Sequence, residues 1–264
     1  MMFTIFRHEM RSYFKNLIIW SVCIGGMGLA CILLFSSMQE NMAGMAENFA
    51  SMGAFADAFG MSQLSIATLM GFYATEVGTI HTLGGAMFAA ILGTGMLSKE
   101  EDGHTSEFLF SLPMARGKII AVKWCSIISN VILLNLFCVG IYLLGIEILG
   151  EEMLLKEFFT YHAMQVIMQL EIAAVCYAIS AFMKKNKLGL GLGIVLLLYA
   201  YDLIARVIPD LSEYKVVTPF SYANAADIFS SGEIDMAAVS IGAVILVLGI
   251  LVAFWEYTRR DLAA

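Results

Sequence analysis

Polar side chains inside long apolar stretches are the residues of this chain whose types could do chemistry. Glu171 lies near the middle of the apolar stretch 158–183, Gln169 precedes it by two residues, and Asn135 lies in the apolar stretch 124–146. A charge at the centre of a membrane costs about 2.5–3.5 kcal/mol on insertion scales, so this carboxyl must face protein or water, or be protonated. It could contact a substrate or cation, or it could be a structural group that is hydrogen-bonded to a neighbour. We favour the structural role, with one of three candidate partners: Asn130, Asn135 or Gln169.

Motifs for catalysis or metal binding are incomplete. His8 and Glu9 begin an HExxH zinc-protease motif, but Ser12 stands where the second histidine is needed. The five cysteines all lie inside apolar stretches, without a CxxC pair, which favours apolar packing over metal binding or a disulfide framework. We therefore predict no catalytic and no metal-binding residues.

The composition predicts a membrane protein. The chain has 264 residues, of which 60% are hydrophobic and only 14% are charged. A soluble protein of this size has too little interior to bury so much apolar surface, and apolar stretches recur along the whole length. We therefore expect an all-α membrane protein with a single transmembrane domain over residues 1–264, rather than two soluble domains.

Six apolar stretches have the length of a transmembrane helix. The first has twenty residues without a charge, and as a helix it would measure about 30 Å, the thickness of the hydrocarbon core. The predicted spans are residues 17–36, 77–97, 124–146, 158–183, 188–208 and 236–257. On the outer surface, segment 38–75 is predicted to form one or two amphipathic helices and segment 209–235 an irregular loop.

Residues 3–16 are predicted to form an amphipathic helix that lies at the membrane interface. Its apolar face consists of Phe3, Phe6, Met10 and Phe14, in line with Leu17. Its basic stripe consists of Arg7, Arg11 and Lys15. Such a helix turns its basic side towards anionic headgroups, so membrane lipid is an expected partner.

Other charged or polar residues near the ends of spans are interpreted as interfacial. Asp202 and Arg206 are four residues apart, a spacing typical of an ion pair on one helix face. Glu76 and His81 flank the start of the second span, where we expect them to lie in the interface.

Basic residues are concentrated on one side of the predicted membrane. The amino terminus, segment 98–123, the loop 184–187 and the carboxyl terminus hold twelve of the fifteen lysines and arginines. The opposite loops hold the other three: Lys156, Arg206 and Lys215. Because cytosolic loops carry the excess of Lys and Arg, both termini and segment 98–123 are predicted to be cytosolic. The expected location is the cell membrane, crossed several times.

Segment 98–123, SKEEDGHTSEFLFSLPMARGKIIAVK, is the longest polar interval on that side. Gly103 permits a turn, Thr105 or Ser106 can cap a short helix, and Pro113 ends it.

The short helix in this segment is predicted to have one apolar face. Phe108, Leu109 and Leu112 fall on that face at helical spacing. A short amphipathic helix between two spans suits docking onto a soluble partner, and the alternative is an ordinary solvated loop.

The stretch HTSEFLFSLPMAR resembles the HTAEFLLTLPVSR-type segment of ABC-2-type permeases, the membrane subunits of ABC transporters. The mild departures are Ser106, Phe110 and Gly117. In that family the segment joins the second and third spans in the cytosol, and the resemblance implies a coupling helix that contacts an ATPase subunit. The matching positions are Glu100, Glu101, His104, Thr105, Glu107, Phe108, Leu109, Pro113, Arg116 and Lys123. The matching positions up to Arg116, together with Leu112 from the apolar face, are the candidate ATPase-coupling residues.

The resemblance implies the permease subunit of an ABC exporter. The chain has no GxxxxGK[ST] segment, so it is not expected to be an enzyme by itself or to bind a cofactor. ATP and Mg²⁺ would be bound by a separate cytosolic ABC ATPase subunit. The other expected partner is a second permease, identical or homologous, in a dimer, and no nucleic acid is expected. Family analogy places the substrate pathway along the second and fifth spans.

Two other functional classes remain open. An ion-coupled secondary transporter could use Glu171 as its coupling carboxylate, although no repeat between two halves of the chain is evident. A membrane-embedded enzyme would need polar groups that converge at one depth, and the sequence shows no recognisable constellation of that kind. A neighbouring gene for a soluble ATPase would favour the ABC transporter.

Overall fold

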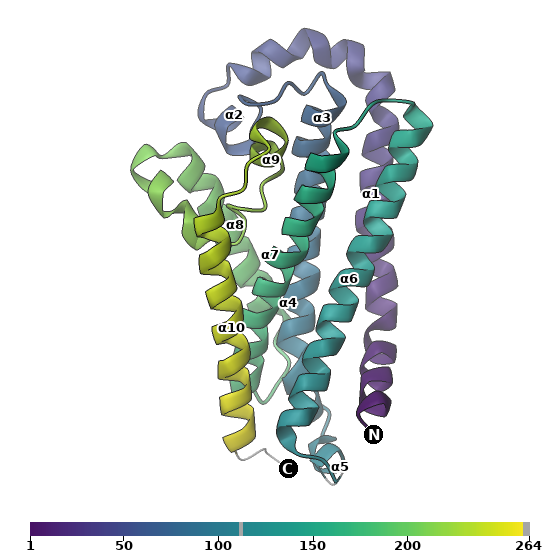
Figure 1. The fold of residues 1–264 in the computed structure, drawn as a ribbon, viewed down its shortest axis with the longest axis vertical. Coiled ribbons are helices and arrows are strands. Elements are labelled where there is room, and N and C mark those ends of the chain that lie inside the picture. The colour runs from purple at the N-terminus through teal and green to yellow at the C-terminus, as the bar shows by residue number, and fades with distance from the viewer. Residues whose placement is uncertain (111–112, 261–264) are drawn as a thin grey trace.

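Six long helices run along the long axis of the molecule (Figure 1). The computed structural model describes residues 1–110 and 113–260, and its secondary structure in this part is helical, with no strand. The long helices are α1 (Met2–Ala50), α4 (Gly78–Asp102), α6 (Arg116–Leu149), α7 (Leu155–Phe182), α8 (Leu188–Val207) and α10 (Met236–Arg259). Each contains a stretch that is long and apolar enough to cross a membrane. The prediction of an all-α membrane protein with six transmembrane helices is therefore confirmed.

The two ends of the bundle differ in what they carry. The start of α1, the end of α10 and the short helix α5 (Ser106–Phe110) lie together at one end, which we call the terminal end (Figure 1). The short helices α2 (Ala54–Phe59), α3 (Leu69–Phe72) and α9 (Ala225–Ser231) gather at the other end, which we call the opposite end.

Helix α1 is continuous, whereas the sequence predicted a separate interfacial helix over residues 3–16 followed by a span. No glycine or proline occurs between Met2 and Ile24, so nothing in this stretch breaks the helix. The buried face also differs from the predicted one: Phe3 and Phe14 are exposed. The buried side chains recur every four residues and include one charged group: Ile5, Glu9, Tyr13 and Leu17.

Helices α4 and α7 form the centre of the bundle. Both are largely buried, whereas α8 and α10 expose most of their side chains. Gly93 permits the close approach of α4 to α7, because a Cβ atom there would lie 2.5 Å from the carbonyl oxygen of Ala173. The backbones of α4 and α7 therefore approach each other closely at this point.

The segment 209–235 is more ordered than the irregular loop that the sequence predicted. It begins with the 3-10 helix η2 (Pro209–Val217) and contains α9. Between these two helices the chain enters the bundle, and Phe220, Tyr222 and Ala223 are buried in a cluster with side chains of α4, α7, α8 and α10. In the other outer segment, α2, α3 and the π-helical turn η1 (Tyr73–Val77) follow the end of α1.

Candidate functional site

The polar segment 98–123 connects α4 to α6 at the terminal end (Figure 1). Helix α4 ends at Asp102, α5 occupies Ser106–Phe110, and α6 begins at Arg116. The turn between α4 and α5 places His104, rather than Gly103, in the left-handed region, with φ 52°. A short helix within the segment was predicted, and the structure contains it.

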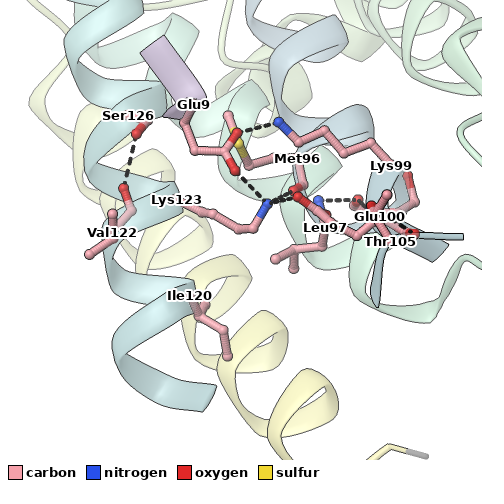
Figure 2. Close-up of polar contacts among 12 residues, drawn as sticks. Glu9, Met96, Leu97, Lys99, Glu100, Thr105, Ile120, Val122, Lys123 and Ser126 are labelled. Atoms are coloured by element: carbon pink, nitrogen blue, oxygen red, sulfur yellow. Dashed lines mark hydrogen bonds and ion pairs between the residues drawn. The ribbon is translucent and has the colours of Figure 1, made fainter. Parts of the chain in front are cut away.

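Lys123 is the centre of a buried ion cluster at the base of this segment. Its side chain is fully buried, and its Nζ donates to Glu9 Oε1 at 2.8 Å, to the carbonyl oxygen of Met96 at 2.8 Å, and to Glu100 Oε1. Lys99 pairs with the second oxygen of Glu9. Figure 2 shows Lys123 between the two carboxylates. The cluster therefore joins the start of α1, the end of α4 and the start of α6.

The charges of this cluster balance, which explains why they tolerate burial. A buried charge is very costly unless a partner of opposite sign and hydrogen bonds compensate it. Two carboxylates, those of Glu9 and Glu100, face the two ammonium groups of Lys99 and Lys123. Lys99 also lies 4.7 Å from the centre of the Tyr13 ring, a cation–π contact.

Arg260 forms a second set of contacts at the terminal end. Its guanidinium pairs with Glu101 of α4 and donates to the carbonyl oxygens of Ala181 and Met183 at the end of α7. Its own carbonyl oxygen accepts a hydrogen bond from Arg116 Nη1 at 2.9 Å. Arg260 therefore contacts residues on both sides of α5.

The three intramembrane polar candidates do not form one site. Asn135 Nδ2 donates to Gln169 Oε1 at 2.7 Å, but Glu171 faces a different neighbour and accepts a hydrogen bond of 2.7 Å from Tyr222 Oη. None of the partners expected for Glu171 is the observed one. The pKa of the Tyr222 hydroxyl is raised well above its usual value, mainly by burial and secondly by the neighbouring Glu171 carboxyl. This hydroxyl therefore stays protonated and donates the hydrogen bond.

A buried aromatic and polar network surrounds Asn135, and sequence reasoning missed it. His81 was expected at the interface, but it is fully buried and contacts Asn135 Oδ1 at 3.0 Å through Nε2. The ring of His162 stands nearly perpendicular to that of His81, with their centres 4.9 Å apart, and its Nε2 lies 2.8 Å from Tyr73 Oη. These partners are 54 to 89 positions apart in sequence, so no local pattern indicates that they meet.

The predicted pair of Asp202 and Arg206 is confirmed, and it belongs to a larger cluster. Arg206 Nε donates to Asp202 Oδ2 at 2.8 Å, and its Nη1 donates to Asp227 of α9 at 2.9 Å. Thr218 Oγ1 donates to the second oxygen of Asp202 at 2.9 Å. These contacts hold α9 and Thr218, the residue after η2, against α8.

Comparison with known protein families identifies the family of this chain. The family profile of ABC-2 family transporter proteins matches residues 3–262. The chain belongs to the ABC-2 transporter family. The match includes all six long helices and segment 98–123, so the resemblance found in thirteen residues extends over nearly the whole chain. No curated protein sequence matches the chain.

In this ABC-2 protein the candidate ATPase-coupling residues divide into two groups. Glu100 and Glu101 are buried and paired inside the chain, with Lys123 and Arg260, so they are not placed to touch another protein directly. Arg116 is half-buried against Arg260. The exposed candidates are His104, Thr105, Glu107 and Pro113.

The predicted apolar face of segment 98–123 is only partly described by the structure. Leu109 is half-buried and packs against a small cluster that contains Ile5 of α1 and Ile119 of α6, so it faces the bundle. The side chain of Phe108 and the whole of Leu112 lie outside the described residues. A cavity of about 570 Å³ is lined by residues that include Ile5, Glu9, Glu100 and Leu109.

The described part of the ABC-2 chain contains no group of three or more His, Cys, Asp or Glu side chains that could hold a metal ion. Its charged clusters are instead paired internally, at the terminal end around Lys123 and Arg260 and at the opposite end around Arg206. These ion pairs hold neighbouring helices and loops of the bundle to one another.

Proposed function

We propose that this ABC-2 family protein is the permease subunit of an ABC exporter that is driven by a separate cytosolic ATPase. The observation that carries the proposal is the family match over residues 3–262, which identifies a membrane component of ABC transporters. The sequence itself contains no GxxxxGK[ST] segment for phosphate binding. ATP and Mg²⁺ would therefore be bound by the partner, and the export direction follows from the family resemblance.

The terminal end of the bundle faces the cytosol in this proposal. The segments that hold twelve of the fifteen lysines and arginines lie at or near that end: the start of α1, segment 98–123, the turn between α7 and α8, and the end of α10. Basic loops are retained on the cytosolic side of the cell membrane. This distribution supports a multi-pass protein with both termini in the cytosol, where a soluble ATPase is available.

Helix α5 is the contact point for the ATPase in this account. It projects at the terminal end with Glu107 exposed, and the ion cluster around Lys123 ties its two flanking helices to α1. When ATP brings two ATPase subunits together, a displacement of α5 is carried into α4 and α6 through buried, paired charges. A second permease, identical or homologous, completes a substrate pathway that alternates between inward and outward access.

The experiment is co-purification of the ATPase with tagged permease from the native host, followed by ATP hydrolysis in lipid. Phe108→Asp places a carboxylate on the predicted apolar face of α5, and a carboxylate buried without a partner in a docking groove is strongly destabilising. Glu107→Lys reverses the charge of an exposed residue of the same helix. Phe55→Asp is the matched control, because Phe55 is an exposed aromatic residue at the opposite end. We expect the α5 variants to insert in the membrane and to lose the ATPase, and the control to keep it. Retention of the ATPase at normal level by both α5 variants would exclude α5 as the docking element.

An ion-coupled secondary transporter is the second candidate, with Glu171 as its coupling carboxylate. The hydrogen bond from Tyr222 to this carboxyl supports a structural role instead. A membrane-embedded enzyme has no comparable observation in its favour.

A further inference from the structure

Arg260, directly after α10, contacts the residues on both sides of α5 at once. Its guanidinium pairs with Glu101, one residue before the end of α4. Its carbonyl oxygen accepts a hydrogen bond from Arg116, the first residue of α6. The chain leaves the bundle after Glu101 to form α5 and returns at Arg116, so one residue fixes the points of exit and return.

The same guanidinium also caps α7. Its Nη1 donates to the carbonyl oxygen of Ala181, and its Nη2 donates to that of Met183 at 3.3 Å. The last carbonyl groups of a helix have no partners within the helix, and a positive charge there is favoured by the helix dipole. Arg260 therefore joins the flanks of α5 to the end of α7, and through its own backbone to α10.

Lys123 makes a different connection. It ties the end of α4 and the start of α6 to Glu9 of α1, and α1 lies beside α6, on the side of the bundle away from α10 (Figure 1). The flanks of α5 are therefore fastened twice, by Lys123 to α1 and by Arg260 to α7 and α10.

We propose that Arg260 is a positioning residue for coupling, which transmits the displacement of α5 to α7 and α10. The proposal rests on the proposed function, in which an ATPase moves α5. A planar guanidinium directs donors in several fixed directions, so it can hold a carboxylate and two carbonyl groups together. A lysine at this position would keep the pairing with Glu101 and lose part of the contact with α7.

The chain offers a matched control in the adjacent residue. Arg259 lies over the ring of Trp255, 5.0 Å from its centre, and is exposed. Arg259→Gln and Arg260→Gln remove the same charge from neighbouring positions, but only the second removes the contacts with Glu101, Ala181 and Met183.

The first measurement uses the full-length permease alone, in lipid nanodiscs. Spin labels at Glu107→Cys in α5 and Thr258→Cys in α10, in a background without native cysteines, report the distribution of distances between the two helices. We expect one narrow distribution for the parent and for Arg259→Gln, a broad one for Arg260→Gln, and an intermediate width for Arg260→Lys.

If Arg260→Gln folds poorly, Glu101→Gln removes the same ion pair from the other side and is expected to broaden the distribution as well. A distribution in Arg260→Gln and Glu101→Gln as narrow as in the parent would overturn the proposal.

The second measurement uses the complex with the co-purified ATPase, trapped with ATP and vanadate. In the parent, we expect the distance between the labels on α5 and α10 to stay constant on trapping, because the two helices move together. In Arg260→Gln, we expect hydrolysis to persist and this distance to shift on trapping. A shift of equal size in the parent and the variant would also overturn the positioning role. If no ATPase co-purifies, the proposed function fails, and the measurement on the permease alone still decides whether Arg260 fixes α5.

Discussion

Tyr222 donates a 2.7 Å hydrogen bond to Glu171 Oε2, and this contact joins a loop from the opposite end of the bundle to the buried face of α7. The third element at this point is α10, where Gly242 leaves room for both side chains: a Cβ atom there would lie 2.3 Å from Glu171 Oε2 and 3.1 Å from the Tyr222 ring. The Glu171 carboxyl therefore lies where this loop, α7 and α10 meet.

Tyr222→Phe is expected to destabilise the protein. It leaves the Glu171 carboxyl without its donor, and a buried polar group that loses its partner costs about 1–3 kcal/mol. Glu171→Gln should cost less, because the amide oxygen can still accept from Tyr222. The measurement is thermal unfolding in detergent, with Tyr214→Phe, an exposed tyrosine of the same segment, as the control. Loss of transport in Glu171→Gln, with assembly and ATP hydrolysis intact, would show that the carboxyl acts on the substrate.

Gly242→Ala is expected to be destabilising, although alanine is the better helix former. The new methyl group would overlap Glu171 and Tyr222, and overpacking of a filled interior costs about 1–3 kcal/mol. Gly140→Ala in α6 is the control, since no atom lies within 4 Å of its Cβ position, and it should be neutral or stabilising by up to about 1 kcal/mol. Equal melting temperatures for the two variants would show that α10 is free to shift away from α7.

Lys123→Met is expected to destabilise the terminal end strongly. It leaves Glu9 and Glu100 buried without their shared cation, and breaking a buried ion pair in this way costs about 3–5 kcal/mol. Lys118→Met, at an exposed position of the same helix, should have little effect. Adding Glu100→Gln to the first variant should recover part of the loss, because Glu9 keeps its pair with Lys99 and no buried carboxylate then lacks a partner. If the double variant were less stable than Lys123→Met alone, the Glu100 carboxylate would have another source of stabilisation.

The orientation of the bundle is tested by labelling single cysteines in whole cells. Ser51→Cys lies at the opposite end and Glu107→Cys in α5, and both positions are exposed. In a background without native cysteines, an impermeant reagent should label Ser51→Cys in intact cells and Glu107→Cys only after the membrane is opened. Labelling of Glu107→Cys in intact cells would reverse the proposed orientation.

The spans and the polar segment could be predicted from sequence because their signals are local. An apolar stretch of spanning length is visible in any window, and so are Gly103, Pro113 and the basic residues around α5. The pair of Asp202 and Arg206 was predictable for the same reason, since four residues on one helix separate its members.

The contacts of the candidate site could not be predicted from the sequence, because they join residues that are far apart along the chain. Glu9 is 114 positions from Lys123, and Glu101 is 159 positions from Arg260. Glu9 was set aside as part of an incomplete zinc motif, although its place four residues from both Ile5 and Tyr13 puts it on the buried face of α1. A lone charge on an otherwise apolar helix face was the one signal that could have indicated a buried ion pair.

The central claim, that an ATPase docks on α5, is tested most directly by a photo-reactive amino acid placed at Glu107 in the native host. The same amino acid at Ser231, exposed at the opposite end, is the control, and cross-linked proteins are identified by mass spectrometry. The account predicts that Glu107 captures a soluble protein with a GxxxxGK[ST] phosphate-binding segment and that Ser231 does not. Capture of such a protein only from Ser231, or from neither position in cells that express the tagged permease at its natural level, would contradict it.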